Sequence, residues 1–203
     1  MSSQPPAHRR PRRRTVLGLG AAIIALAGCA GQDDLAEQAK AGDDKNYIAG
    51  DGSVNEYPPA SRGSRVSLEG QLFNGEKVSA QDWAGKVVVL NFWYAACAPC
   101  RVEAPDLAAL HTEFKDKGVL FFGVNVRDDA ATAAAFERTF NVQYPSIDDS
   151  DGGVLLAMTE YVPPRAVPTT LVLDTEGRVS ARILGVSQKG TLKALITSAA
   201  TGS

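Results

Sequence analysis

The segment VVVLNFWYAACAPC, residues 87–100, determines which fold class we expect for this chain. Its first six residues are apolar apart from Asn91, as expected of a strand that is buried on both faces. Residues 98–117 follow a helical pattern that ends at Gly118. A buried strand that passes through a short loop into a helix is typical of α/β proteins.

Two cysteines lie where the expected strand gives way to the helix. Cys97 is expected at the helix N-terminus, where the helix dipole and free backbone N–H groups stabilise a thiolate. Cys100 follows one turn later, close enough to resolve a mixed disulfide formed by Cys97. Structural zinc would need four ligands, and the only other cysteine and histidines are Cys29, His8 and His111. We therefore expect a redox pair and no metal.

The remaining chain alternates between strand and helix patterns. Asn74-Gly75 is a strong hairpin signal, and apolar runs and amphipathic stretches predict the other elements. The expected elements are a hairpin at 66–78, strands at 119–126, 169–173 and 178–184, and helices at 129–140, 153–160 and 187–199. This order predicts an α/β sandwich with a mixed sheet flanked by helices and an N-terminal hairpin.

The first 28 residues are typical of an export signal. Five arginines between Arg9 and Arg14 precede an uncharged apolar run of twelve residues at 16–27. A helix of this length reaches roughly 18 Å, too short for a hydrocarbon core of about 30 Å. We expect a cleaved signal, exported by the twin-arginine or the general secretory route.

The sequence LAGC at residues 26–29 resembles the lipobox of bacterial lipoproteins. This implies that Cys29 carries lipid, becomes the first residue of the mature protein and anchors it to the membrane. Lipid on Cys29 leaves Cys97 and Cys100 as a single pair.

Residues 29–62 are rich in Gly, Asp, Ser and Pro and predict a tether, with the folded domain at 63–203. The alternative is that Tyr47, Ile48, Val54 and Tyr57 pack part of this segment onto the domain, so a simple linker is favoured only for residues 30–45.

Composition and charge exclude two broad classes. With 203 residues, 44% of them hydrophobic, the chain is long and apolar enough to bury a core, which excludes a disordered chain. The 21 Lys and Arg face 23 Asp and Glu, and only 16 of these basic residues remain once 1–28 are set aside. The remaining chain is acidic, which argues against a sequence-independent nucleic-acid binder.

Several motifs together resemble one family: Gly85-Lys86, the strand that leads to Trp93, Cys97-Ala98-Pro99-Cys100, Arg101, Glu103, Pro105 and Val167-Pro168-Thr169-Thr170. From about Asn46 onward the chain resembles the membrane-anchored thioredoxin-like proteins of the TlpA/ResA family. The resemblance implies a thioredoxin-like three-layer sandwich and a thiol-disulfide oxidoreductase outside the cytoplasm, in many members a reductase that serves cytochrome c maturation. Many members carry Trp immediately before the first cysteine, where this chain has Ala96, so the surface beside the active site differs.

The resemblance also implies where substrate binds. It implies that the Val167-Pro168 bond is cis and faces the cysteines, where an exposed Val167 backbone could pair with an extended substrate. The residues expected to contact substrate are Trp93, Pro99, Val167 and Pro168.

Glu103 is expected to donate and accept protons during exchange. On a 3.6-residue helix it shares one face with Cys100, Leu107, Leu110 and Phe114, so its carboxyl group points to the apolar side. Burial there raises the pKa of a carboxyl group, which suits acid–base work near neutrality. The alternative is a glutamate that turns outward or caps its own helix.

Other polar residues are expected to serve the structure. Thioredoxin has a buried acid at the position of Asn91, and because Asn exchanges no proton in this range, we expect it to satisfy buried backbone groups. His111 lies about 16 Å beyond Cys100 along the helix, too far to act on either thiol. The acidic runs at 128–129 and 148–151 lack EF-hand spacing and predict solvated turns and caps.

The expected protein is a lipid-anchored, monomeric thiol-disulfide oxidoreductase on the extracytoplasmic face of the cell membrane, with the Cys97–Cys100 disulfide as its only redox group. We expect it to reduce protein disulfides, with apocytochrome c as a candidate client. Because the compartment is oxidising, it would take electrons from a CcdA-like thiol carrier in the membrane.

Other functions are compatible with parts of this sequence. A thiol oxidase that introduces disulfides is an alternative, because the sequence does not fix the redox direction. A thioredoxin-like copper carrier is another, although such carriers space their cysteines by three residues and use a late histidine that this chain lacks. Peroxidase activity is discounted, since a peroxiredoxin has Thr three residues before the reactive cysteine and this chain has Tyr94.

Overall fold

The computed structural model describes residues 50–202; the expected export signal, Cys29 and much of the expected tether lie outside this range. Within the described residues, the strands form one sheet of eight in the order β1-β8-β7-β4-β5-β6-β2-β3. The strands are β1 (Val54–Glu56), β2 (Glu69–Leu72), β3 (Lys77–Ser79), β4 (Val88–Trp93), β5 (Leu120–Asn125), β6 (Ser146–Asp148), β7 (Thr169–Leu173) and β8 (Val179–Leu184).

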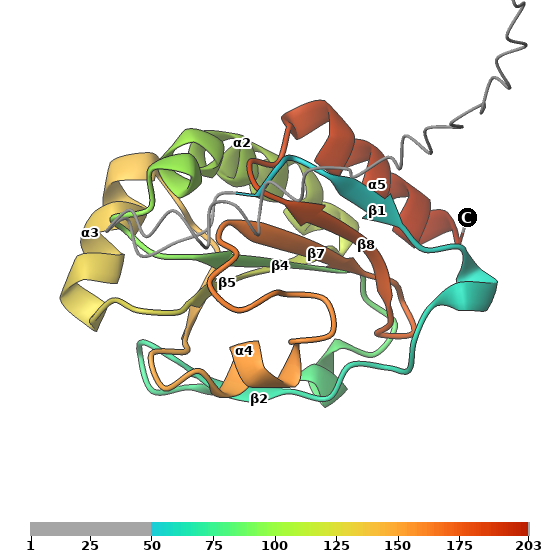
Figure 1. Ribbon diagram of the computed structural model, residues 1–203, viewed down its shortest axis with the longest axis horizontal. Coiled ribbons are helices and arrows are strands. Elements are labelled where there is room, and N and C mark those ends of the chain that lie inside the picture. Colours follow the sequence, from blue (N-terminus) through green and yellow to red (C-terminus); the bar gives the residue numbers. More distant parts are fainter. Residues whose placement is uncertain (1–49, 203) are drawn as a thin grey trace, which may run out of the picture. The chain divides into compact units, whose positions relative to one another are not determined.

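The helices cover both faces of this sheet. They are α2 (Ala98–Phe114), α3 (Ala130–Phe140), α4 (Gly153–Ala157) and α5 (Lys189–Thr201), with short 3₁₀ turns at Pro59–Ser61, Ala80–Trp83 and Lys115–Lys117. Figure 1 shows α2, α3 and α5 on one face and α4 on the other. Pairing is parallel between β4, β5 and β6 and antiparallel elsewhere. The expected α/β sandwich with a mixed sheet is confirmed.

Strand β4 lies in the centre of the sheet, and all six of its residues are buried. It pairs in parallel with β5 and in antiparallel with β7. Side chains alternate between the two faces: Val89 packs with Leu110 of α2 and Leu192 of α5, whereas Leu90 packs into the cluster that holds Met158. Burial on both faces explains the continuous apolar run in the sequence.

The predicted elements at 87–92, 98–117, 119–126, 129–140, 169–173 and 178–184 are confirmed to within two residues, apart from the last turn of 98–117, which is 3₁₀. The N-terminal hairpin is also confirmed. Its turn contains Gly75 with a φ of 89°, and Glu76 donates its N–H to the side-chain oxygen of Asn74. Gly118 ends the second element with a φ of 79°.

Two strands escaped the sequence analysis. β6 and β1 have three residues each, too short for a periodic pattern, and all three residues of β1 are exposed. β1 lies within the expected tether, yet Val54 pairs with Ile183 and the N–H of Tyr57 donates to the carbonyl oxygen of Ser180 at 2.8 Å. The backbone of 54–57 completes the edge of the sheet, as in the alternative in which Val54 and Tyr57 join the domain, and the predicted start of the domain at residue 63 is therefore too late.

Arg62 ties this N-terminal segment to the β7–β8 turn. Its Nη1 lies 3.1 Å from Oδ2 of Asp174, and the two side chains are 2% and 4% exposed. Asp174 also accepts from the N–H groups of Glu176 and Arg178 and from the Arg178 guanidinium. Burial raises the pKa of Asp174, but these bonds and charges outweigh it and hold the pKa below its usual range.

Among the helices of residues 50–202, none combines the length and the apolar character needed to cross a membrane.

Replacing Arg62 with alanine is expected to lower the free energy of unfolding by about 1–3 kcal/mol, because the buried Asp174 carboxylate loses a donor. Urea denaturation followed by circular dichroism measures the change. Arg65→Ala is the matched control, since Arg65 is exposed and donates to the Glu176 carbonyl in the same turn. Its effect should stay within about 0.5 kcal/mol. Equal losses in both variants would contradict the role given to the buried ion pair.

Candidate active site

Cys97 and Cys100 form a disulfide at the start of α2, with their Cα atoms 5.3 Å apart. Cys97 is the N-cap residue of this helix, and its Sγ accepts a hydrogen bond from the N–H of Cys100 at 3.2 Å. The predicted place of Cys97 is confirmed. After reduction, this N–H group and the positive end of the α2 dipole would stabilise a thiolate on Cys97.

Small residues surround the disulfide at the surface. Cys97 and Cys100 are 0% and 2% exposed, whereas Ala96 and Ala98 are exposed and Pro99 is half-buried. Val102, one turn into α2, is 68% exposed. The surface beside the disulfide is therefore formed by small, mainly apolar residues, including part of Pro99.

Glu103 is buried beneath this turn and is held by three donors. Its side chain lies among the buried residues of α2, and the residue is 1% exposed. Asn91 donates its Nδ2–H to Oε1 at 2.6 Å, and Ser187 donates its N–H and Oγ–H to Oε2 at 2.8 and 3.0 Å. The predicted inward orientation is confirmed.

Burial raises the pKa of Glu103 to about 7, against the lowering effect of the bonds from Ser187 and Asn91. The carboxyl group can therefore gain or lose a proton near neutral pH. The charge of Glu103 also affects Tyr144. Burial is the main cause that raises the pKa of the Tyr144 phenol, and the carboxylates of Glu103 and Glu137 raise it further.

The partners of Glu103 include residues that sequence reasoning missed. Asn91 bonds the carboxyl group and the Thr170 hydroxyl, at 3.1 Å, so its side chain does not serve backbone groups as expected. Ser187 lies 84 positions after Glu103 in the chain, just ahead of α5. No local sequence pattern links residues so far apart, because their contact depends on how α5 packs beside α2.

The structure changes the roles of two expected substrate-binding residues. Trp93 is 3% exposed, with its ring 4.3 Å from that of Phe136, so it belongs to the core beneath α3. Val167 is 3% exposed and donates its N–H to the carbonyl oxygen of Arg165. Its N–H is therefore engaged in a tight turn, and its backbone is not exposed as predicted.

Pro168 has the cis bond that was expected before it and lies immediately before β7. The Val167-Pro168 bond is cis, as the family resemblance implied. Thr169 pairs with Phe92 in the sheet, so the start of β7 lies beside the end of β4, from which the cysteine turn departs.

His111 and the acidic runs have structural environments. The His111 ring lies 5.6 and 5.5 Å from the rings of Phe121 and Tyr144, and burial, then the charge of Lys115, lowers its pKa. Asp129 caps α3 by accepting the N–H of Thr132. These observations agree with the structural roles expected from the sequence.

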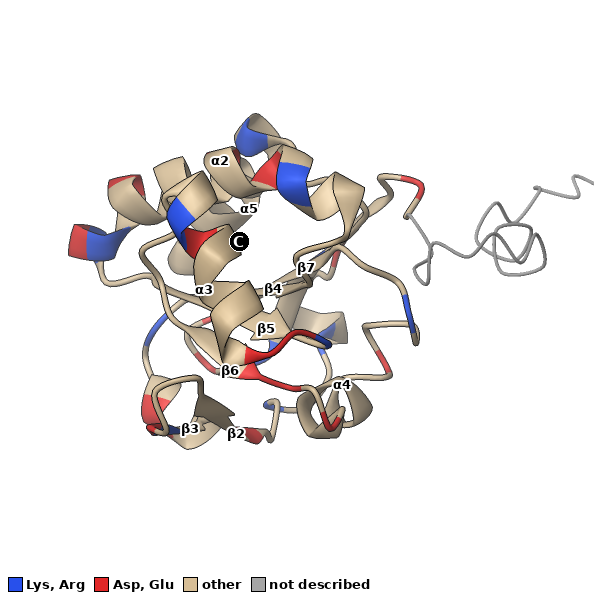
Figure 2. Cartoon of the chain, turned by 90° about the vertical axis from the view of Figure 1, so that its left-hand side faces the viewer, with Lys and Arg blue, Asp and Glu red and all other residues tan. Residues whose placement is uncertain are grey.

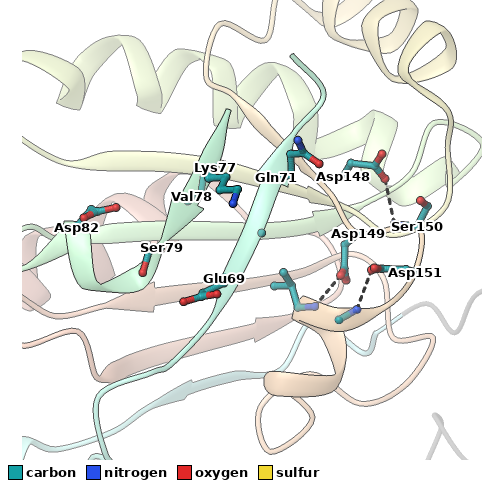
Figure 3. Close-up of a pocket in the computed structure, with 13 residues that line it drawn as sticks. Glu69, Gln71, Lys77, Val78, Ser79, Asp82, Asp148, Asp149, Ser150 and Asp151 are labelled. Carbon is teal, nitrogen blue, oxygen red and sulfur yellow. Dashed lines mark hydrogen bonds between the residues drawn. The ribbon is translucent and has the colours of Figure 1, made fainter. Parts of the chain in front are cut away.

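The second acidic run borders a pocket of about 670 Å³ between β2, β3 and the β6–α4 loop (Figure 3). Figure 2 shows this run in red beside β6 and α4. Asp149 is 1% exposed, and its two oxygens accept the N–H groups of Val154 and Leu155 at 2.6 and 2.9 Å. It caps α4 as predicted but is buried instead of solvated. Within residues 50–202, no group of three or more His, Cys, Asp or Glu residues is arranged to hold a metal ion.

Known proteins are similar to this chain in sequence and in fold. The model of the AhpC/TSA family matches residues 65–182. Thiol-disulfide oxidoreductase ResA of Bacillus subtilis (strain 168) is 36% identical over 112 residues, which make up 55% of this chain and 60% of that protein. The match therefore spans less than two thirds of the relative's length.

Solved structures agree with the sequence relatives. A DsbF homologue from Corynebacterium diphtheriae is similar with a TM-score of 0.63 and 33% identity, covering 73% of this chain and 94% of that one. A secreted thiol-disulfide isomerase from Corynebacterium glutamicum has a TM-score of 0.63 and 30% identity, covering 72% and 94%. The expected thioredoxin-like fold and the resemblance to ResA are confirmed.

The stability of the protein is expected to fall by about 3 kcal/mol between pH 4.5 and pH 8 because of Glu103. Its folded pKa of about 7 lies above the ordinary value of 4.5, so the folded chain holds this proton more tightly than the unfolded chain. Below pH 4.5 both states are protonated and Glu103 adds no such cost.

Glu103→Gln should remove this part of the pH slope, as measured by urea denaturation at several pH values. Asp106→Asn, on the same helix but partly exposed, is the control and should keep the wild-type slope. A Gln variant with an unchanged slope would show that Glu103 does not titrate in this range.

Proposed function

Since this chain belongs to the AhpC/TSA family and is a ResA-like protein of the thioredoxin family, we propose that it is an extracytoplasmic thiol-disulfide oxidoreductase that reduces protein disulfides. The observation that carries the proposal is the Cys97–Cys100 disulfide at the N-terminus of α2, with the buried carboxyl group of Glu103 one turn behind it.

The proposed reaction is dithiol–disulfide exchange. The Cys97 thiolate attacks one sulfur of a client disulfide, and the other client sulfur leaves as a thiolate. Cys100 then attacks the Cys97 sulfur of this mixed disulfide, which releases the second client sulfur. The client gains two electrons and the two protons of the dithiol, and the Cys97–Cys100 disulfide forms. A dithiol donor returns two electrons and two protons to the protein.

Glu103 supplies a proton site for this exchange in our proposal. It lies three residues after Cys100 on the buried face of α2, and a pKa of about 7 leaves both of its protonation states populated near neutral pH. It can accept the Cys100 proton when that thiol must become a nucleophile. In the reverse step it returns the proton to the leaving thiolate.

The proposed electron donor is inferred from the oxidising compartment, and the proposed clients are inferred from the surface beside the disulfide. A reductase in an oxidising compartment needs electrons from across the membrane, so we propose a CcdA-like thiol carrier as the donor. We propose clients with accessible cysteine pairs, such as apocytochrome c. The exposed Ala96 and Ala98 and the half-buried Pro99 leave room for such a segment to approach.

The alternative redox direction is a thiol oxidase or isomerase. It is favoured by the similarity to the secreted thiol-disulfide isomerase from Corynebacterium glutamicum. The two directions use the same cysteines and differ in the reduction potential of the pair.

The reduction potential of the Cys97/Cys100 couple tests the proposed direction. We expect a value near or below about −270 mV, that of thioredoxin, when the protein is equilibrated with dithiothreitol buffers and read by alkylation and mass spectrometry. A value near about −120 mV would make the protein an oxidant. Copper titration of the reduced protein is the companion measurement, and tight stoichiometric Cu(I) binding without disulfide reductase activity would favour a carrier.

We also propose that the protein acts at the outer face of the membrane through lipid on Cys29. The LAGC sequence at 26–29 supports this, and the similar isomerase from Corynebacterium glutamicum is described as secreted.

Intact-mass spectrometry of the membrane fraction is expected to show a chain that begins at Cys29 and carries added acyl mass. Cys29→Ser should abolish that mass and release the protein from the membrane fraction, while Cys100→Ser, the control, should leave both unchanged. A mature wild-type species without acyl mass would refute the anchor.

A further inference from the structure

The turn at residues 94–97, which leads into α2, is stabilised by side chains that bond the backbone of its second residue. The N–H of Cys97 donates to the carbonyl oxygen of Tyr94 at 3.1 Å, which closes a turn over residues 94–97. A turn of this kind uses the first carbonyl and the last N–H and leaves the polar groups of the second residue without partners inside the turn. That second residue is Ala95, immediately before Ala96 and Cys97.

Both backbone groups of Ala95 are bonded by charged side chains. Its N–H donates to Oδ2 of Asp128 at 2.6 Å, and its carbonyl oxygen accepts from Nη1 of Arg101 at 3.2 Å. Arg101 belongs to the first turn of α2, whereas Asp128 belongs to the loop between β5 and α3. The turn is therefore fixed by two elements, one of them outside the strand–turn–helix unit that carries the cysteines.

Asp128 is itself held in place by Asn125, the last residue of β5. Nδ2 of Asn125 donates to Oδ2 of Asp128 at 2.9 Å, and Oδ1 of Asn125 accepts the N–H groups of Arg127 and Asp128 at 3.1 and 2.8 Å. Asn125 is 0% exposed and pairs with Trp93 across the parallel strands. Because this arrangement starts from the buried end of β5, the carboxylate is oriented towards Ala95 by the sheet.

A second contact joins the same two loops. The Arg127 guanidinium lies 4.1 Å from the centre of the Tyr94 ring, in the range of a cation–π interaction.

Asp129, the residue after Asp128, has different contacts. It is exposed and accepts the N–H of Thr132 at the start of α3. The sequence predicts a turn or a helix cap for both aspartates, and the structure separates their roles.

We infer that Asp128 is a positioning residue of the redox site, which acts through the N–H of Ala95 to hold the turn that places Cys97 at the N-terminus of α2. This inference deepens the proposed dithiol–disulfide exchange and rests on it. The β5–α3 loop then contributes to the equilibrium between the dithiol and disulfide forms of Cys97 and Cys100.

Loss of the Asp128 carboxylate is expected to favour the dithiol form for two reasons. In the disulfide form the covalent bond keeps the turn in place, so the N–H of Ala95 stays without its acceptor; in the dithiol form the turn can relax and find another partner. Removing a negative charge near Cys97 also favours a thiolate there. An interaction that is stronger in one state shifts the equilibrium by the difference between the two states.

The test measures the equilibrium constant between dithiol and disulfide in a glutathione buffer at pH 7, with the otherwise unaltered chain. Asp128→Ala should shift it towards the dithiol by about three- to tenfold, the factor that corresponds to one net hydrogen bond. Asp128→Asn keeps an acceptor oxygen and loses only the charge, so it should shift the constant in the same direction by about two- to threefold. Asp129→Asn, which keeps the cap of α3, should match the wild type.

An Asp128→Ala protein that folds and shows the wild-type constant, or a shift towards the disulfide, would overturn the inference. If this variant does not fold, Asp128→Asn decides, and a constant equal to that of the wild type and of Asp129→Asn overturns it. The outcome is distinct from a failure of the proposed function, because the wild-type constant tests the redox direction and the ratio between variants tests Asp128.

Discussion

The buried carboxyl group of Glu103 is the constraint on which the geometry around the redox pair depends. A carboxyl group that is 1% exposed has lost its water, which is costly unless other donors replace it. Asn91 of β4 and Ser187 ahead of α5 provide those donors. Because the bonds join α2 to the central strand and to the start of α5, they fix the helix that carries the cysteines. The same burial keeps the proton of Glu103 exchangeable near neutral pH.

The sheet brings the remaining parts of the site to one edge. The carboxyl ends of the parallel strands β4 and β5 point the same way, and the antiparallel β7 begins where β4 ends. The cysteine turn, the loop with Asp128 and the cis bond before Pro168 therefore lie at the same end of neighbouring strands. Binding at the carboxyl ends of strands is common in α/β proteins, because the loops there converge from different parts of the chain.

Sequence and structure disagree where burial cannot be judged from local pattern. Trp93 and Val167 flank the redox pair in the family motif, yet Trp93 packs against Phe136 and Val167 closes a turn with Arg165. Segment 54–57 lies in the polar, glycine-rich range 29–62 assigned to the tether, and the alternative in which Val54 and Tyr57 join the domain is the one observed, since their backbone groups complete the edge beside β8. For Trp93 and for segment 54–57 the deciding contact comes from a segment far away in the chain, whereas for Val167 it is a turn two residues long that local pattern does not predict.

By itself the sequence determined the strand–turn–helix unit, the position of Cys97 at a helix N-terminus, the inward face of Glu103 and the α/β class. These features depend on neighbours within a few residues, through apolar runs, helical spacing and turn residues. Only the tertiary structure decided that Asn91 and Ser187 bond Glu103, and that Asp128 bonds Ala95 while Asp129 caps a helix. Asp128 and Asp129 are the same residue type, so the sequence cannot tell which of them caps a helix and which bonds the cysteine turn. Their roles depend on which donors the packed strands and helices bring within about 3 Å of each carboxylate.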